Sequence, residues 1–175
     1  MYFVTDTTQS VTHADHMLLG HVCATLRALC DVGARHTEAN PHWSMLDIDC
    51  HTIARLISRI FPELTLVDGY IIGLDIKSSN DTIPTVNTDH SWLQTPDQAI
   101  IDPYPMGLIS TTGALLIPTS GTKFVAHGSN LYQEDKSVRS RFNAEEKWRE
   151  ARSCMRLLRK YVSHKDLVKI YADIY

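Results

Sequence analysis

The sequence lacks several features that would assign it to a familiar class. No apolar run approaches the ~20 residues that a membrane-spanning helix needs. Only four cysteines occur among 175 residues, and no two of them form a CxxC pair. This argues against both a dense disulfide framework and a cysteine-rich structural zinc site. The four are Cys23, Cys30, Cys50 and Cys154.

The chain also lacks a secretion signal at its start and a strong net charge. The first ten residues, MYFVTDTTQS, contain no basic region followed by an apolar stretch. With thiols that have no obvious disulfide partner, this predicts a cytoplasmic protein, although export by a route without a sequence signal stays open. The net charge is −3, and basic residues gather only near the C-terminus. Their spacing is typical of an exposed helix face, so we expect no nucleic-acid partner. They are Arg149, Arg152, Arg156, Arg159 and Lys160.

What is present is the composition of an ordinary folded domain. Hydrophobic residues make up 43% of the chain and charged residues 21%. We therefore expect one domain over residues 1–175, with a core large enough to fold without metal or disulfide staples, and we expect no cofactor. Nothing in the sequence bears on the oligomeric state.

Apolar residues recur at helical spacing in two segments of the N-terminal half. We expect the first helix over residues 15–32, with Gly33 as its stop. We expect the second over residues 50–61, capped by the side chain of Asp49 or Asp47. The second helix would therefore begin at a cysteine.

Strand-like runs bounded by turn residues fill the middle of the chain. We expect five strands there, over residues 64–75, 90–94, 99–102, 114–118 and 123–126. A long polar loop is expected over residues 128–141, then a capped helix from Asn143 and a short final helix from Ser163. Helices, then strands, then helices predict an α+β fold with a small antiparallel sheet.

Cys50 is the candidate nucleophile. A thiol must lose its proton to react, and a free cysteine has a pKa of ~8.5. The start of a helix favours the thiolate through the helix dipole, and its free amides can bind a developing oxyanion. Cys50 has such a position and the other three cysteines do not.

His90 and Asp102 are the candidate partners of this thiol. Both belong to the run HSWLQTPDQAIIDPYP, in which a Pro-Asp turn joins two strand-like pieces. A three-residue loop that pairs Thr95 with Ala99 would place both side chains on one face, diagonally opposed at ~7 Å. A two-residue loop would place them on opposite faces.

Taken together, these segments resemble the transglutaminase-like and papain-like superfamily. The residues that carry the resemblance are Asp49-Cys50-His51, His90-Ser91-Trp92 and Ile101-Asp102-Pro103. It implies N-terminal helices packed on a small antiparallel sheet, with C-terminal helices after it. It also implies that Cys50 attacks a carbonyl, His90 shuttles the proton and Asp102 orients His90.

The function expected from this resemblance is hydrolysis of an amide through a Cys50 thioester, with a peptide bond or a glutamine side chain in a protein or peptide as substrate. Two alternatives remain open: acyl transfer to an amine, as in transglutaminases, and a non-catalytic scaffold that keeps the fold. The papain-type C-G-S-C-W context and the Arg-Gly-Gly run of arylamine acetyltransferases are both absent. The reaction subtype is therefore not set by the motif.

Two further interpretations concern neighbouring residues. Trp43 and Trp92 are candidates to line the substrate cleft or to supply an oxyanion donor, with a role in the core as the alternative. A zinc site near Cys50 and His51 is disfavoured, because adjacent residues on a helix project about 100° apart. We therefore expect no bound metal.

Overall fold

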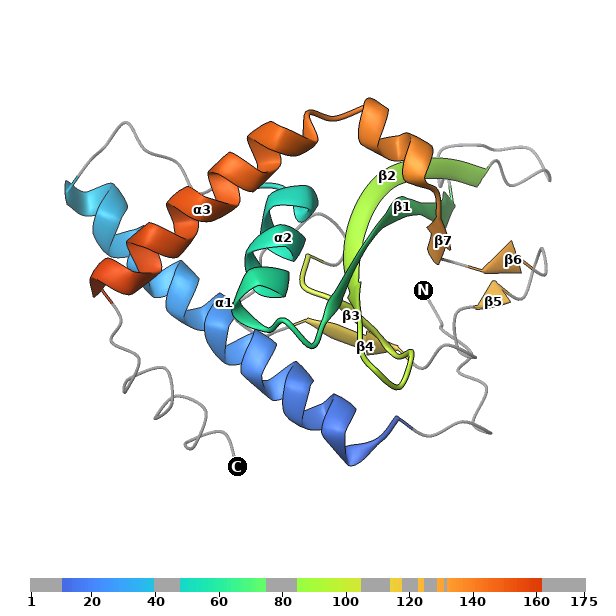
Figure 1. Ribbon diagram of the computed structural model, residues 1–175, viewed down its shortest axis with the longest axis horizontal. Coiled ribbons are helices and arrows are strands. Elements are labelled where there is room, and N and C mark those ends of the chain that lie inside the picture. The colour runs from blue at the N-terminus through green and yellow to red at the C-terminus, as the bar shows by residue number, and fades with distance from the viewer. Residues whose placement is uncertain are drawn as a thin grey trace.

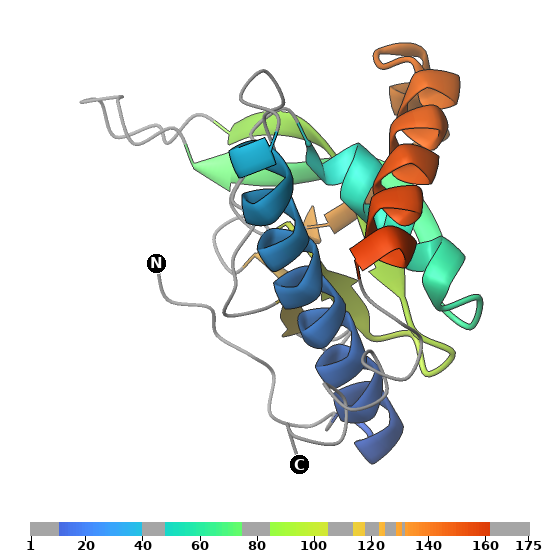
Figure 2. The same cartoon turned by 90° about the vertical axis from the view of Figure 1, so that its left-hand side faces the viewer.

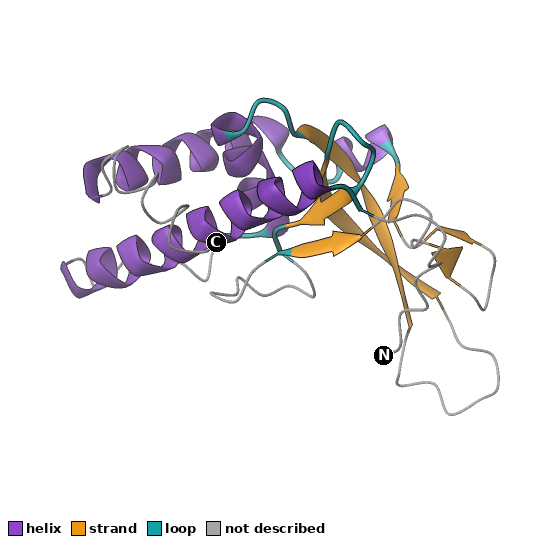
Figure 3. Ribbon diagram, turned by 90° about the horizontal axis from the view of Figure 1, so that it is seen from below, coloured by secondary structure: helices purple, strands orange, loops and turns teal. Residues whose placement is uncertain are grey.

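The described residues form an α+β fold with an antiparallel sheet, as the sequence predicted, and they contain three α-helices. The computed structural model describes residues 11–39, 48–74, 85–104, 114–117, 123–124, 129–130 and 132–161. The helices are α1 (His13–Ala39), α2 (Cys50–Ile60) and α3 (Ala144–Tyr161). Figures 1 and 3 show the helices gathered on one side and the strands on the other.

The main sheet has five strands in the order β4-β3-β2-β1-β7, and every neighbouring pair is antiparallel. A separate two-stranded sheet pairs β5 with β6. The strands are β1 (Thr65–Leu74), β2 (Thr85–Gln94), β3 (Ile100–Asp102), β4 (Leu115–Ile117), β5 (Lys123–Phe124), β6 (Ser129–Asn130) and β7 (Tyr132–Glu134). The central strand β2 therefore has β3 on one side and β1 on the other.

The first helix starts at a reciprocal cap and runs further than expected. The Thr12 amide donates to Asp15 Oδ2 at 3.0 Å, and the Asp15 amide donates to Thr12 Oγ1 at 3.1 Å. The expected stop at Gly33 is wrong, because α1 continues to Ala39. A glycine inside a helix costs only about 1 kcal/mol relative to alanine. Burial of Gly33 and of the apolar stripe that ends at Val32 outweighs that cost.

The polar stretch over residues 128–141 is not one long loop, and this expectation is also wrong. It contains strands β6 and β7 and the 3-10 helix η4 (Lys136–Ser140). Strand β7 pairs with β1 over three residues, with Tyr132 opposite Ile71. So short a strand has no readable periodicity, and its pairing comes from distant parts of the chain.

The main core lies where the three helices meet one face of the sheet. Figure 2 shows α1 crossing in front of the sheet, with α3 beside it. Side chains from α1, α2, α3, β2 and β3 fill this layer, each contributing roughly 1.5–3 kcal/mol by leaving water. Among them are Leu26, Leu29, Leu56, Leu93, Ile101 and Leu158.

The other face of the sheet carries a second, smaller cluster built around Trp92. The indole is 3% exposed and meets the Tyr132 ring edge-on, with 5.3 Å between ring centroids. Val67, Ile100 and Ile117 complete the cluster. Both faces of the middle of β2 are therefore buried.

The basic residues of α3 lie on its exposed side, as their spacing predicted. A pocket of about 290 Å³ lies between this side of α3 and the end of α2. Its lining consists of Arg59, Arg152, Met155, Arg156 and Arg159. Across the described helices, none is long and apolar enough to cross a bilayer.

Some expectations fall on residues outside the described ranges. These are the possible cleft residue Trp43 and the final helix from Ser163. They remain predictions.

Gly69 gives a test of how tightly the second cluster is packed. A Cβ at this position would lie 2.7 Å from Trp92 Cη2 and against the carbonyl oxygen of Gln133. The carbonyl belongs to β7 and cannot move without disturbing its pairing with β1. Gly69→Ala should therefore lower the free energy of unfolding by about 1–3 kcal/mol, as overpacking does. Urea denaturation measures this.

The matched control is Thr65→Ala, which shortens an exposed side chain of the same strand. It should change the stability by no more than about 0.5 kcal/mol. Equal midpoints for Gly69→Ala and the wild type would show that the described packing around Trp92 is wrong.

Candidate active site

Cys50 is the first residue of α2, and the cap before it determines this position. The Asp49 side chain accepts a hydrogen bond from the Thr52 amide at 2.9 Å. The helix therefore begins at Cys50, as predicted. The Cys50 side chain lies at the positive end of the helix dipole and is buried, with 9% of the residue exposed.

Helix α3 holds this end of α2 in place through a small polar cluster. Lys147 Nζ lies 2.9 Å from Asp49 Oδ2 and 3.0 Å from Glu150 Oε2. The Thr52 hydroxyl donates to the same Glu150 oxygen at 2.6 Å. The cap and the first turn of α2 are thus tied to α3 by both charge and hydrogen bonds.

The hairpin between β2 and β3 has the predicted three-residue loop. The Thr95 amide donates to the Ala99 carbonyl at 2.9 Å, and the Gln98 amide donates to the Thr95 carbonyl at 2.9 Å. Gln98 has a φ of 69°, the left-handed conformation of a turn with a bulge. The ladder then pairs Leu93 with Ile101. His90 and Asp102 consequently lie on the same face.

These two side chains form a direct hydrogen bond. His90 Nε2 lies 2.9 Å from Asp102 Oδ2. Asp102 is fully buried and accepts two more hydrogen bonds, from the Tyr104 amide at 3.0 Å and from the Tyr132 hydroxyl at 2.7 Å. Three donors around one buried carboxylate hold it in place opposite the imidazole.

Sequence reasoning missed Tyr132, because the residue was expected in a loop. Burial, the charge of Asp102 and the hydrogen bond to it together raise the pKa of Tyr132. The hydroxyl therefore keeps its proton and donates a hydrogen bond to Asp102. The one available signal was an aromatic residue in a polar stretch, which does not reveal its partner.

Cys50 and His90 meet across the gap between α2 and β2. They share a hydrogen bond, and Nδ1 is the ring nitrogen that faces the sulfur because Nε2 is bonded to Asp102. Burial alone would raise the pKa of Cys50, but hydrogen bonds and charge from His51 and His90 lower it to about 6. Burial alone would lower the pKa of His90, but Asp102 and Cys50 raise it to about 9. Between these values the pair is a thiolate and an imidazolium.

A second histidine, His51, also lowers the pKa of the Cys50 thiol. Its Nδ1 lies 2.7 Å from Ser91 Oγ, and its ring stacks on Phe142 with 3.9 Å between centroids. Sequence reasoning missed this effect, because it gave His51 only a disfavoured role as a zinc ligand. In the described part of the chain, no three His, Cys, Asp or Glu side chains are grouped so as to hold a metal ion.

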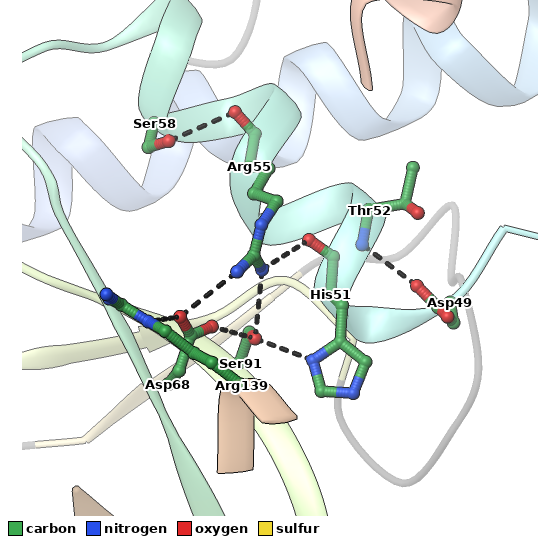
Figure 4. A network of polar contacts seen from close by, with 8 residues as sticks. All are labelled: Asp49, His51, Thr52, Arg55, Ser58, Asp68, Ser91 and Arg139. Carbon is green, nitrogen blue, oxygen red and sulfur yellow. Dashed lines mark hydrogen bonds and ion pairs between the residues drawn. The ribbon is translucent and has the colours of Figure 1, made fainter. Parts of the chain in front are cut away.

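Ser91 connects His51 to a buried charge cluster, which Figure 4 shows. The Ser91 hydroxyl donates to Asp68 Oδ1 at 2.5 Å. Asp68 Oδ2 accepts from Arg55 Nη2 at 3.0 Å and from Arg139 Nε at 2.6 Å. Burial alone would raise the pKa of Asp68, but the bonds from Ser91 and the two arginines lower it. Asp68 is therefore ionised.

Trp92 packs against the ring of His90, two residues before it on β2. The two rings stack with 6.4 Å between centroids and 16° between planes. The indole is thus a buried neighbour of the imidazole, in keeping with a role in the core. This contact restricts the orientation of the His90 ring.

No protein-family model, curated protein or solved structure is detectably similar to this chain. The resemblance to the papain-like and transglutaminase-like superfamily therefore rests on the quoted motifs.

The thiols should differ sharply in their reaction with iodoacetamide. Labelling of Cys50 should rise with pH through a midpoint of about 6 and then level off. Burial raises the pKa of Cys154 to about 11, so this thiol should stay unreactive at neutral pH. Burial and Asp31 also raise the pKa of Cys30. Peptide mass spectrometry of native protein labelled across roughly pH 4–10, a range that brackets the Cys50 midpoint of about 6, measures each site.

Cys154 and Cys30 serve as internal controls in the same sample. If either is labelled before Cys50 at pH 7, the choice of nucleophile is wrong. A Cys50 midpoint in the ordinary range of ~8.5 would show that the histidines do not stabilise its thiolate.

Proposed function

We propose that the chain is a cysteine hydrolase that cleaves an amide through a Cys50 thioester. The substrate class is a peptide bond or a glutamine side chain. One observation carries this proposal: a buried Asp102–His90–Cys50 chain of hydrogen bonds that ends at a capped helix start. The α+β arrangement of helices on an antiparallel sheet is compatible with a papain-like or transglutaminase-like architecture, which we propose with it.

The first half of the reaction would use the thiolate–imidazolium pair. The Cys50 thiolate attacks the amide carbon, and the carbonyl electrons move to oxygen. When the tetrahedral intermediate collapses, the C–N bond breaks and His90 Nδ1 gives its proton to the leaving amine. The products of this half are a free amine, a Cys50 thioester and a neutral His90.

The second half would return the site to its starting state. His90 takes a proton from water, and the resulting hydroxide attacks the thioester carbon. The C–S bond breaks, releasing a carboxylic acid and restoring the Cys50 thiolate beside protonated His90. Asp102 stabilises the imidazolium and keeps the proton on Nε2 in both halves.

The start of α2 offers donors for the oxyanion. The first intrahelical bond runs from the Ile53 amide to the Asp49 carbonyl, and the Thr52 amide is taken by the cap. The amides of Cys50 and His51 precede these bonds and point out of the helix start. The Cys50 amide is our candidate donor, because it lies next to the carbon that the sulfur attacks.

Two alternatives remain. Transfer to an amine would use the same thioester with an amine in place of water, and hydrolysis is preferred because water needs no second binding site. A non-catalytic scaffold is favoured by one observation, the low 9% exposure of Cys50. Acylation of the native protein separates the scaffold from both enzyme classes.

The test uses p-nitrophenyl acetate, an activated acyl donor that reports thioester formation without a known substrate. The wild type should show acetylated Cys50 by mass spectrometry and release p-nitrophenol. Asp102→Asn should slow acylation by on the order of 10²–10⁴, because His90 loses the group that fixes its tautomer and charge. The melting temperature of each variant reports folding separately.

Asp97→Asn is the matched control, since it makes the same change in an exposed residue of the same hairpin. It should acylate at the wild-type rate. If Asp102→Asn does so too, with unchanged melting, the three residues are not coupled and the scaffold alternative holds. A primary amine present during turnover distinguishes the two reactions, because transfer yields its acetamide whereas hydrolysis yields acetate.

A further inference from the structure

Four arginines surround the pocket between α2 and α3. The pocket has a volume of about 290 Å³, and its fifth lining residue is Met155. Arg59 comes from the last turn of α2, whereas Arg152, Arg156 and Arg159 come from α3. The two helices pack directly against each other, as Figure 2 shows, so the arginines extend from fixed backbone. The pocket is therefore a cationic cavity with walls from two helices.

This pocket is separate from the candidate active site. Cys50 is the first residue of α2, whereas Arg59 lies in its last turn. A helix rises about 1.5 Å per residue, so roughly 14 Å of α2 lies between them. The proposed reaction uses no residue that lines the pocket.

The arginines of the pocket lack carboxylate partners. Within the described ranges, none of the four forms an ion pair, and all four are exposed. Arg156 Nη2 donates to the neutral Ser153 hydroxyl at 3.1 Å. Each guanidinium carries five N–H donors and a permanent positive charge. The pocket therefore presents many charged donors to any anion that enters it.

The charges on α3 are placed where they repel one another. Arg152 and Arg156 are four residues apart, and Arg156 and Arg159 are three apart. Side chains at these spacings are neighbours, and like charges there destabilise the helix. The helix dipole favours cations only within the last turn, which accounts for Arg59 and Arg159. An exposed helix face thus explains only part of the cluster, and a bound anion would explain the rest.

Phosphate is the anion that suits this set of donors. A guanidinium binds phosphate oxygens through two parallel hydrogen bonds, which gives geometric fit as well as charge. The volume of about 290 Å³ corresponds to that of roughly ten water molecules. This is enough room for two neighbouring phosphoryl groups, and arginines on two helices can hold them from opposite sides.

We propose that this pocket binds an anion with two neighbouring phosphoryl groups, held by Arg59 on one side and by the three arginines of α3 on the other. The group belongs either to a small molecule in solution or to a lipid headgroup, since both present the same chemistry. Its binding relieves the repulsion among the arginines and so stabilises the folded chain. The proposal does not depend on the proposed function.

The test is isothermal titration calorimetry of the full chain with pyrophosphate. An ionic strength of about 0.15 M screens long-range attraction, so that contacts within the pocket decide the affinity. The wild type should bind pyrophosphate at one site and bind inorganic phosphate more weakly. Arg59→Gln and Arg156→Gln should each weaken pyrophosphate binding by about tenfold, because each removes charged hydrogen bonds.

Arg149→Gln is the matched control, since Arg149 is an exposed arginine of α3 outside the pocket lining. It should leave the affinity unchanged. Equal weakening in this variant would show general attraction to α3 and overturn the proposal. An unchanged affinity in Arg59→Gln would do the same, as would the absence of binding to the wild type.

Melting curves give a second measurement that does not depend on heats of binding. Pyrophosphate should raise the melting temperature of the wild type and leave that of Arg59→Gln/Arg156→Gln unchanged. Without pyrophosphate, the curves also show whether each variant folds. If Arg59→Gln does not fold, Arg59→Lys replaces it, and the loss of the planar fork should still weaken binding.

Vesicles distinguish the two sources of the phosphoryl groups. Co-sedimentation with phosphatidylcholine vesicles that contain a phosphatidylinositol bisphosphate assigns the pocket to a lipid headgroup. Pyrophosphate binding without co-sedimentation assigns it to a soluble ligand. A single-stranded oligonucleotide that binds more tightly than pyrophosphate, and that is weakened equally by Arg149→Gln, would overturn the proposal in favour of a nucleic-acid surface.

Discussion

The contact between the first turn of α2 and the middle of β2 determines the geometry of the whole candidate site. Strand β2 lies inside the sheet and is buried on both faces, so it cannot move relative to its neighbours. Helix α2 packs against α3, and Lys147 links the Asp49 cap to that helix. Each catalytic candidate thus comes from an element that packing has already fixed.

Burying so many polar groups is expensive unless each one is satisfied. Asp102 has three donors, and Asp68 has Ser91 and two arginines. Such networks are destabilising when one partner is missing, because a charge is then left buried without compensation. Among the described residues, two buried side-chain atoms have no hydrogen-bond partner, Asp15 Oδ1 and Arg55 Nε, and the second belongs to this network. The contact of its guanidinium with the Phe142 ring offsets part of that cost.

The sequence was sufficient to predict those parts of the site in which local signals agree with the tertiary contacts. An aspartate before a cysteine at the start of an apolar helical repeat predicted the cap and the position of Cys50. The Pro-Asp turn predicted the loop length, and through it the shared face of His90 and Asp102. Both inferences depend on neighbours within about a dozen residues, the range over which backbone geometry follows from composition.

The rest of the site could not be predicted because its partners come from far along the chain. Tyr132 reaches Asp102 from a strand of three residues whose pairing with β1 leaves no local pattern. Ser91 and Asp68 are small polar residues within strands, where an exposed position is the usual expectation. Their burial becomes visible only when α2 covers that face of the sheet.

The three-residue hairpin loop has a consequence for how the chain tolerates insertions and deletions. Side chains alternate along a strand, so a loop changed by one residue would slide β3 by one position and turn Asp102 to the opposite face. A change of two residues would restore the phase while shifting the pairing. The loop is therefore free to vary in composition at the exposed Pro96, for example, whereas the parity of its length is constrained. A tag or peptide grafted into this exposed turn should preserve that parity, a rule set by the hairpin geometry.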